Sequence, residues 1–168
     1  TTYTQPAVLT TSVAMIEAMR EKLSDVGRRV RPRLFGGHSL GLFSAAVAAE
    51  ALTFRDALTL VVERARLMSA FNAARPVGMA SIIGLDSDAV AQICEDSTRS
   101  PLDRVAVANH NLDTQTVISG DVSALERAME RAKELQGRVI RLKVKVSSHT
   151  PLHAEQAHEF ALHIDEIP

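Results

Sequence analysis

The residues best placed to do chemistry are five in a row, Gly37-His38-Ser39-Leu40-Gly41, a G-x-S-x-G pattern with serine at its centre. The apolar pair Leu34-Phe35 before it and the small residues 44–49 after it predict a strand, a tight turn and a helix. Gly37 and Gly41 would leave space around the serine hydroxyl, and the first N–H groups of the helix would point at an oxyanion beside it. A glycine-rich turn with a serine helix cap is the alternative for a bare match. The flanking elements favour a nucleophile at Ser39.

Two further residues could assist a nucleophile. His149 follows a strand predicted over residues 139–146 and lies in a loop, where a catalytic base can be presented. Arg64 lies close to the apolar stripe of a helix that a capping pair, Thr53 and Asp56, would begin. The spacing alone favours an arginine that extends to solvent. The alternative is a partly buried guanidinium aimed at a carboxylate ligand, which its planar fork suits.

A metal site is not predicted. His153 and His158 occur with Glu155 and Glu159, but their spacing is not H-E-x-x-H. Pro151 also interrupts the first helical turn of that segment. We therefore expect neither a metal nor a cofactor.

Composition limits the class of protein. A hydrophobic content of 46% in 168 residues is enough for a core, and with 4% aromatic residues that core is mostly aliphatic. The net charge of −1 does not suggest nucleic acid or an anionic membrane as partner. No apolar run predicts a membrane span, and no leader is visible. The single Cys94 cannot form an internal disulfide, which fits a reducing, cytoplasmic compartment. Cys94 shares an apolar face with Val90 and Ile93, which predicts a small core residue and not a reactive thiol.

The remaining periodicity predicts a second, smaller fold inside the chain. The first helix is predicted to begin near Pro6 and to end near Gly27. A basic connection follows. It is interpreted as a solvated turn or, alternatively, as a docking surface for an acidic carrier domain. Further along, strands are predicted at 79–85, 105–108, 115–119 and 139–146, with a polar turn at 109–114. Helices are predicted from Asp86 through Cys94 and over 121–135. The order β-α-β-β-α-β is that of a ferredoxin-like unit. We predict this subdomain at residues 77–146, inserted between residues 1–76 and 147–168 of a larger one.

In combination, these segments resemble the malonyl-CoA:acyl carrier protein transacylase family, which includes the acyltransferase domains of fatty acid and polyketide synthases. The resemblance runs nearly end to end and is carried, in order, by Thr4-Gln5-Pro6-Ala7, Gly37-His38-Ser39-Leu40-Gly41, Glu63-Arg64-Ala65-Arg66-Leu67-Met68, Met79-Ala80-Ser81-Ile82-Ile83-Gly84-Leu85, Ala108-Asn109-His110-Asn111, Val117-Ile118-Ser119-Gly120 and Ser148-His149. It implies an α/β fold in which an α/β-hydrolase-like subdomain, incomplete here, carries the ferredoxin-like insertion.

The resemblance also implies roles for individual residues. Ser39 would be acylated, His149 would be its base, and Arg64 would bind the malonyl carboxylate. The other implied site residues are Gln5 lining the pocket, Leu40 holding the oxyanion through its backbone N–H, His38 flanking the acyl group and Asn109 in a nearby loop.

The implied reaction is acyl transfer. Ser39 would attack the thioester of malonyl-CoA or a related acyl-CoA, and the phosphopantetheine thiol of an acyl carrier protein would accept the acyl group. Two rivals remain: a serine thioesterase with water as acceptor, and a non-catalytic relative that only docks carrier domains. Neither nucleic acid nor a membrane is an expected partner.

Three departures from the family pattern stand out. The family begins with a strand and a Gly-Gln-rich loop that completes the oxyanion hole, and it continues beyond residue 168. Leu42 stands where many relatives have glutamate, and Ser148 leaves the choice between malonyl and methylmalonyl open. We therefore expect this chain to be a fragment of a longer protein.

Overall fold

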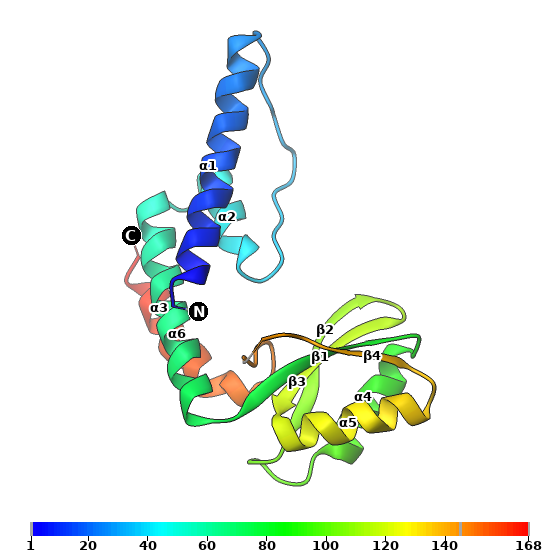
Figure 1. Ribbon diagram of the computed structural model, residues 1–168. Helices are drawn as coiled ribbons and strands as arrows, with labels where there is room; N and C mark the ends of the chain where they lie inside the picture. Colours follow the sequence, from blue (N-terminus) through cyan, green and yellow to red (C-terminus); the bar gives the residue numbers. More distant parts are fainter. Residues whose placement is uncertain (1, 145, 168) are drawn as a thin grey trace. The chain divides into compact units, whose positions relative to one another are not determined.

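The computed structural model describes residues 2–144 and 146–167 (Figure 1). It is a mixed α/β structure with one small antiparallel sheet. The predicted α/β class is thereby confirmed. The chain forms two compact units, one of residues Thr1–Leu67 and Phe160–Pro168 and one of residues Met68–Glu159. Within the described part of the chain, no helix is both long and apolar enough to cross a membrane.

Helices make up the first unit. They are α1 (Thr4–Asp25), α2 (Gly41–Ala48), most of α3 (Phe54–Ala74) and the end of α6 (Ala154–Asp165). The predicted first helix is confirmed: it starts two residues before Pro6, and Gly27 just beyond its end has a φ of 69°. Side chains from α1 and α3 form the centre of the core and pack against α2 and the turn before it. The core residues are Leu9, Ala57 and Val61, with Leu40, Phe43 and Val47 against them.

The strand predicted before Ser39 is absent: residues 34–37 have no regular structure. Leu34 is 90% exposed. A strand exists only through hydrogen bonds to a neighbour, and no other described segment pairs with this one. The helix after Ser39 packs against α1. The four arginines that lead into this segment are all exposed; they are Arg28, Arg29, Arg31 and Arg33.

Helix α3 begins with the predicted cap. The Asp56 N–H donates to Thr53 Oγ1 at 3.1 Å, and the Thr53 hydroxyl donates to Asp56 Oδ2 at 2.5 Å. The Thr53 side chain thereby satisfies one orphan N–H at the helix N-terminus, and the Asp56 carboxylate accepts the Thr53 hydroxyl in return. The helix runs on to Ala74 and carries Arg64 at its middle.

The second unit is built around the sheet. Along the chain it comprises β1 (Val77–Ile83), α4 (Ser87–Ser97), β2 (Val105–Leu112), β3 (Gln115–Asp121), α5 (Val122–Glu134), β4 (Arg138–Arg141) and the 3₁₀ helix η1 (Pro151–His153). The strands lie in the order β2-β3-β1-β4, and every neighbouring pair is antiparallel. The central pair β1–β3 runs in register from Val77 opposite Asp121 to Ile83 opposite Gln115.

Helices α4 and α5 cover one face of this sheet (Figure 1). Large side chains fully buried between the helices and the sheet are Ile82, Val90, Ile118 and Leu125. Cys94 lies in the same cluster, and burial raises the pKa of its thiol to about 12. Its prediction as a core residue is confirmed.

Two predicted boundaries in this unit were wrong. Asn109 is not in a turn but in β2, where it pairs with Val117, because the β2–β3 ladder extends to the two-residue turn at residues 113–114. The last strand is shorter than predicted, since its ladder with β1 ends where Arg141 pairs with Ala80. Residues 142–144 and 146 of the predicted strand have no regular structure, and residue 145 lies outside the described residues.

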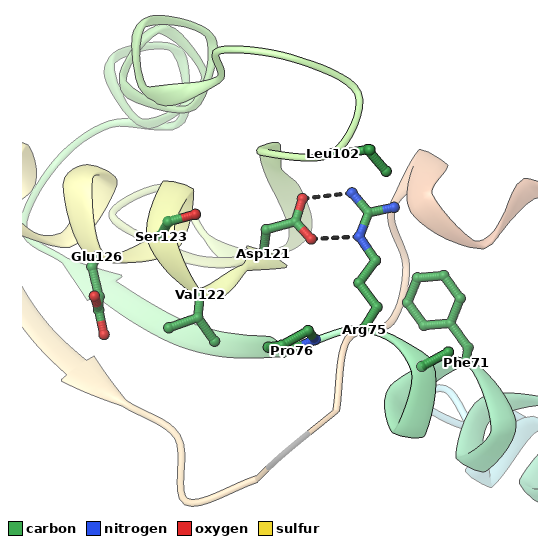
Figure 2. A pocket seen from close by; sticks show the side chains of 9 residues that line it. Phe71, Arg75, Pro76, Leu102, Asp121, Val122, Ser123 and Glu126 are labelled. Atoms are coloured by element: carbon green, nitrogen blue, oxygen red, sulfur yellow. Dashed lines mark hydrogen bonds and ion pairs between the residues drawn. The ribbon is translucent and has the colours of Figure 1, made fainter.

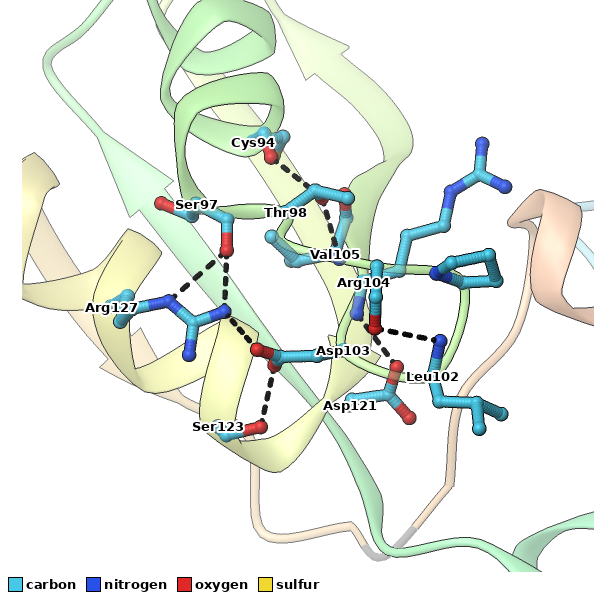
Figure 3. A network of polar contacts seen from close by, with 12 residues as sticks. Cys94, Ser97, Thr98, Leu102, Asp103, Arg104, Val105, Asp121, Ser123 and Arg127 are labelled. Atoms are coloured by element: carbon cyan, nitrogen blue, oxygen red, sulfur yellow. Dashed lines mark hydrogen bonds and ion pairs between the residues drawn. The ribbon is translucent and has the colours of Figure 1, made fainter.

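A polar network joins the end of α4, the connection to β2 and helix α5 (Figure 3). Arg127 of α5 donates to the Ser97 carbonyl at the end of α4 at 2.6 Å and to Asp103 Oδ2 at 2.7 Å. Asp103 also accepts from the Ser123 hydroxyl at 2.6 Å. These bonds hold the connection between α4 and β2 against the start of α5.

Candidate active site

Ser39 stands on a strained turn. Its φ is +52°, in the left-handed region that costs a non-glycine residue about 1 kcal/mol or more. The turn closes through hydrogen bonds from the Gly41 N–H to the His38 carbonyl (2.9 Å) and from the Leu42 N–H to the Ser39 carbonyl (3.0 Å). Helix α2 follows immediately. Strain of this kind is typical of a serine held out for reaction.

The two glycines of the motif contribute differently. A Cβ on Gly37 would lie 2.1 Å from the backbone carbon and oxygen of Gly41, so no other residue fits there without moving the turn. A Cβ on Gly41 would meet no atom within 4 Å. The close approach thus requires glycine at position 37, whereas position 41 has room for a Cβ.

The Leu40 side chain joins the turn to the core, and the Leu40 backbone N–H is available as a hydrogen-bond donor. Its side chain packs against the cluster of Leu9, Ala57 and Val61, which fixes the turn on α1 and α3. The N–H groups of residues 41–43 donate within the turn, whereas the Leu40 N–H donates to no group among the described residues. This amide, directly after Ser39, can therefore hold an oxyanion.

Arg64 and Gln5 complete the group in the first unit. Arg64 Nη2 donates to Ser39 Oγ at 3.1 Å, and Nη1 donates to Gln5 Oε1. Gln5 comes from the first turn of α1 and Arg64 from the middle of α3. Three residues far apart in sequence therefore meet, and the half-buried guanidinium points at the serine hydroxyl.

The charge of Arg64 is not balanced by a carboxylate of the described residues. Burial lowers the pKa of Arg64, with no opposing contribution from an acid. Arg75, in contrast, is paired with an acid (Figure 2). The Asp121 carboxylate accepts hydrogen bonds from Arg75 at 2.5 and 2.6 Å, and this hydrogen bonding raises the pKa of Arg75. Glu63, next to Arg64, accepts instead from Arg66 and lies 3.2 Å from His163. A half-buried cation without an acid suits an anionic ligand.

The remaining predicted residues lie elsewhere. His38 is exposed on the same turn as Ser39. His149 belongs to the second unit, in the connection between β4 and η1, where it is exposed and has a φ of +58°. Asn109 lies in the same unit, on β2, and is half-buried.

Sequence reasoning gave no role to two polar side chains, one half-buried and one buried, that contact the connection before His149. They are Asn72 of α3 and Ser119 of β3. A single polar residue within an apolar pattern has no spacing that marks it as functional; Ser119 lies in the segment Val117-Ile118-Ser119-Gly120 that carries the resemblance, whereas no signal in the sequence points to Asn72.

Comparison with known proteins agrees with this geometry. Residues 1–168 match the acyl transferase domain family. Malonyl CoA-acyl carrier protein transacylase of Haemophilus influenzae is 36% identical over 165 residues, covering 98% of this chain and 51% of that protein. The solved structure of the malonyl CoA-acyl carrier protein transacylase from Coxiella burnetii has a TM-score of 0.90 at 37% identity, covering 99% of this chain and 51% of that one.

A second similar solved structure contains a partner protein. It is a type II PKS acyl-carrier protein in complex with its malonyl-transacylase, with a TM-score of 0.90, 34% identity and coverage of 99% of this chain and 52% of that one. The chain thus spans about half the length of the relatives it matches.

Proposed function

Since the chain belongs to the acyl transferase domain family, we propose that it carries the nucleophile of an acyltransferase that moves malonyl from coenzyme A to the thiol of an acyl carrier protein. The similarity to malonyl transacylases over nearly the whole chain supports the reaction and the donor. The solved complex with a carrier protein supports the acceptor.

In the first half-reaction Ser39 Oγ attacks the thioester carbonyl and passes its proton to His149. The Leu40 N–H donates to the oxyanion of the tetrahedral intermediate. The C–S bond then breaks, and the coenzyme A thiolate takes the proton from His149. The carrier thiol repeats these steps in reverse, giving its proton to His149 and returning Ser39 to its free form.

Arg64 gives the reaction its selectivity. Its guanidinium lies 3.1 Å from the attacking oxygen and has no acid partner among the described residues, and this is the observation that carries the proposal. A malonyl group on Ser39 would bring a carboxylate within reach of the guanidinium, which could bind it through a charge-assisted pair. Gln5, already bonded to Arg64, holds the guanidinium in place. An acetyl group offers no such carboxylate.

The proposed fold has two subdomains. Residues 1–76 and 147–168 would belong to an α/β-hydrolase-like subdomain and residues 77–146 to a ferredoxin-like insertion. The element order β1-α4-β2-β3-α5-β4 and the strand order β2-β3-β1-β4 support the insertion. The strained turn at Ser39 supports the hydrolase-like part.

A competition experiment tests the function. The full-length protein is incubated with malonyl-CoA and acetyl-CoA together, with and without the holo carrier protein, and acyl groups on enzyme and carrier are counted by mass spectrometry. Arg64→Ala should lower the malonyl-to-acetyl ratio by about 100-fold, the value of one strong charge-assisted pair of roughly 2.7 kcal/mol. Arg55→Ala, an exposed arginine on the same helix, is the matched control and should leave the ratio unchanged.

Three results would contradict the proposal. An equal malonyl-to-acetyl ratio in wild type and Arg64→Ala would remove the role of Arg64. Release of free malonate in place of transfer to the carrier would indicate a thioesterase. Carrier binding without any acyl-enzyme would indicate a docking protein.

A further inference from the structure

The connection that carries His149 lies on the face of the sheet opposite to helices α4 and α5. Along β1 and β3 alternate residues point to opposite faces, and Ala80, Ile82 and Ile118 point into the core under α4 and α5. Ser119 and its partner Met79 therefore point to the other face. Both are buried, because the connection with Ser147 and Ser148 covers them.

Four polar contacts fasten this connection. The Ser147 N–H donates to Asn72 Oδ1 at 3.2 Å, and the Ser147 and Ser119 hydroxyls lie 3.0 Å apart. The Ser148 N–H donates to Ser119 Oγ at 3.3 Å, and the Ser148 hydroxyl lies 3.6 Å from Met79 Sδ. The two residues before His149 are thus held by α3 on one side and by the sheet on the other.

Ser119 makes three polar contacts in this arrangement. A hydroxyl has one proton to donate and two lone pairs. The Ser119 hydroxyl can donate its one proton to the Ser147 hydroxyl at 3.0 Å or to the Gly78 carbonyl at 3.3 Å, and a lone pair accepts the Ser148 N–H at 3.3 Å. Removal of the Ser119 hydroxyl would leave the half-buried Ser148 N–H without its acceptor and would take away the contact with the buried Ser147 hydroxyl.

The backbone after these contacts is strained. His149 has a φ of +58°, a conformation that a histidine keeps only where its surroundings impose it. We propose that Ser119 and Asn72 are positioning residues: by fastening Ser147 and Ser148, they set the place and the left-handed backbone of His149. This inference rests on the proposed function, in which His149 is the base for Ser39.

A double-mutant cycle tests the inference in the full-length protein. The rate of Ser39 acylation by malonyl-CoA is measured by rapid quench and mass spectrometry for Ser119→Ala, His149→Ala and the double variant. Ser119→Ala should slow acylation by about 10- to 100-fold when His149 is present, because small displacements of a catalytic group have effects of this size. In the His149→Ala protein the same change should alter the rate by less than about two-fold. A merely structural role would lower both rates equally.

Ser81→Ala is the matched control. Ser81 is a buried serine on β1 that points to the same face as Met79, and its hydroxyl has no partner among the described residues. The variant should keep its acylation rate within about two-fold in both backgrounds.

Should Ser119→Ala fail to fold, Asn72 provides the second measurement. Asn72→Ala removes the acceptor of the Ser147 N–H, whereas Asn72→Asp keeps an oxygen in that place. Slow acylation in Asn72→Ala and recovery in Asn72→Asp are expected.

The possible failures differ from one another. Equal losses in both backgrounds, or equally slow Asn72→Ala and Asn72→Asp, would overturn the positioning role alone. A wild-type protein without acyl-enzyme, or His149→Ala at the wild-type rate, would count against the proposed function itself.

Discussion

The substitution Gly37→Ala tests the geometry of the turn that holds Ser39. The new Cβ would lie 2.1 Å from the carbon and oxygen of Gly41 and 2.5 Å from the Leu42 nitrogen. All three are backbone atoms, so no side-chain rotation can relieve the contact. Reaching even the 3.0 Å limit below which real Cβ contacts essentially do not occur would open the turn by roughly 1 Å.

Both stability and chemistry should suffer. Overpacking of this kind costs about 1–3 kcal/mol in the free energy of unfolding. A displacement of about 1 Å at the nucleophile should slow acylation roughly 100-fold. Gly41→Ala is the control for stability, since its Cβ meets open space at the start of α2 and should change the free energy of unfolding by less than about 0.5 kcal/mol.

Urea unfolding and the rate of Ser39 acylation measure the two effects. If Gly37→Ala matched wild type in both, the close approach of residues 37 and 41 would not be needed for the turn. If Gly41→Ala were the more damaging change, the assignment of the two glycines would be reversed.

Three further changes have defined outcomes. His149→Ala should slow acylation by about two to four orders of magnitude while keeping the circular dichroism of wild type, and an unchanged rate in quench-flow would exclude it as the base. Thr53→Ala should lower the free energy of urea unfolding by about 1 kcal/mol through loss of the α3 cap, and an unchanged midpoint would show that the cap contributes nothing. Hydrogen bonds from Ser123 and then Arg127 lower the pKa of Asp103 below 3.8, so its contribution to stability is present near neutral pH and is lost as pH falls below that value. Asp103→Asn should therefore flatten the acid side of the stability–pH curve, and a curve of the wild-type shape would contradict this assignment.

Local signals predicted most of the elements. Asp86 caps α4 by accepting the Ala89 N–H at 2.7 Å, and Thr53 caps α3, both as their sequence patterns indicated. The alternation of apolar residues identified the strands of the small sheet. These features depend on neighbours within a few residues, which is what a sequence pattern contains.

Features that depend on distant partners were mispredicted or missed. The apolar residues 34–35 lack a paired neighbour among the described residues and form no strand, whereas Asn109 joins one because Val117 pairs with it. The candidate site shows the same difference between local sequence signals and contacts with distant residues. The motif predicts Ser39 as the nucleophile from five adjacent residues. Asn72, in contrast, contacts Ser147 across 75 positions of sequence, a distance at which spacing carries no information.

The most direct measurement is the identification of the acylated residue. The full-length protein is incubated briefly with malonyl-CoA and digested, and the peptides are sequenced by mass spectrometry. The malonyl group should be found on Ser39, disappear when the holo carrier protein is added, and be absent from Ser39→Ala. A stable malonyl adduct on the Ser39→Ala protein would contradict the central claim.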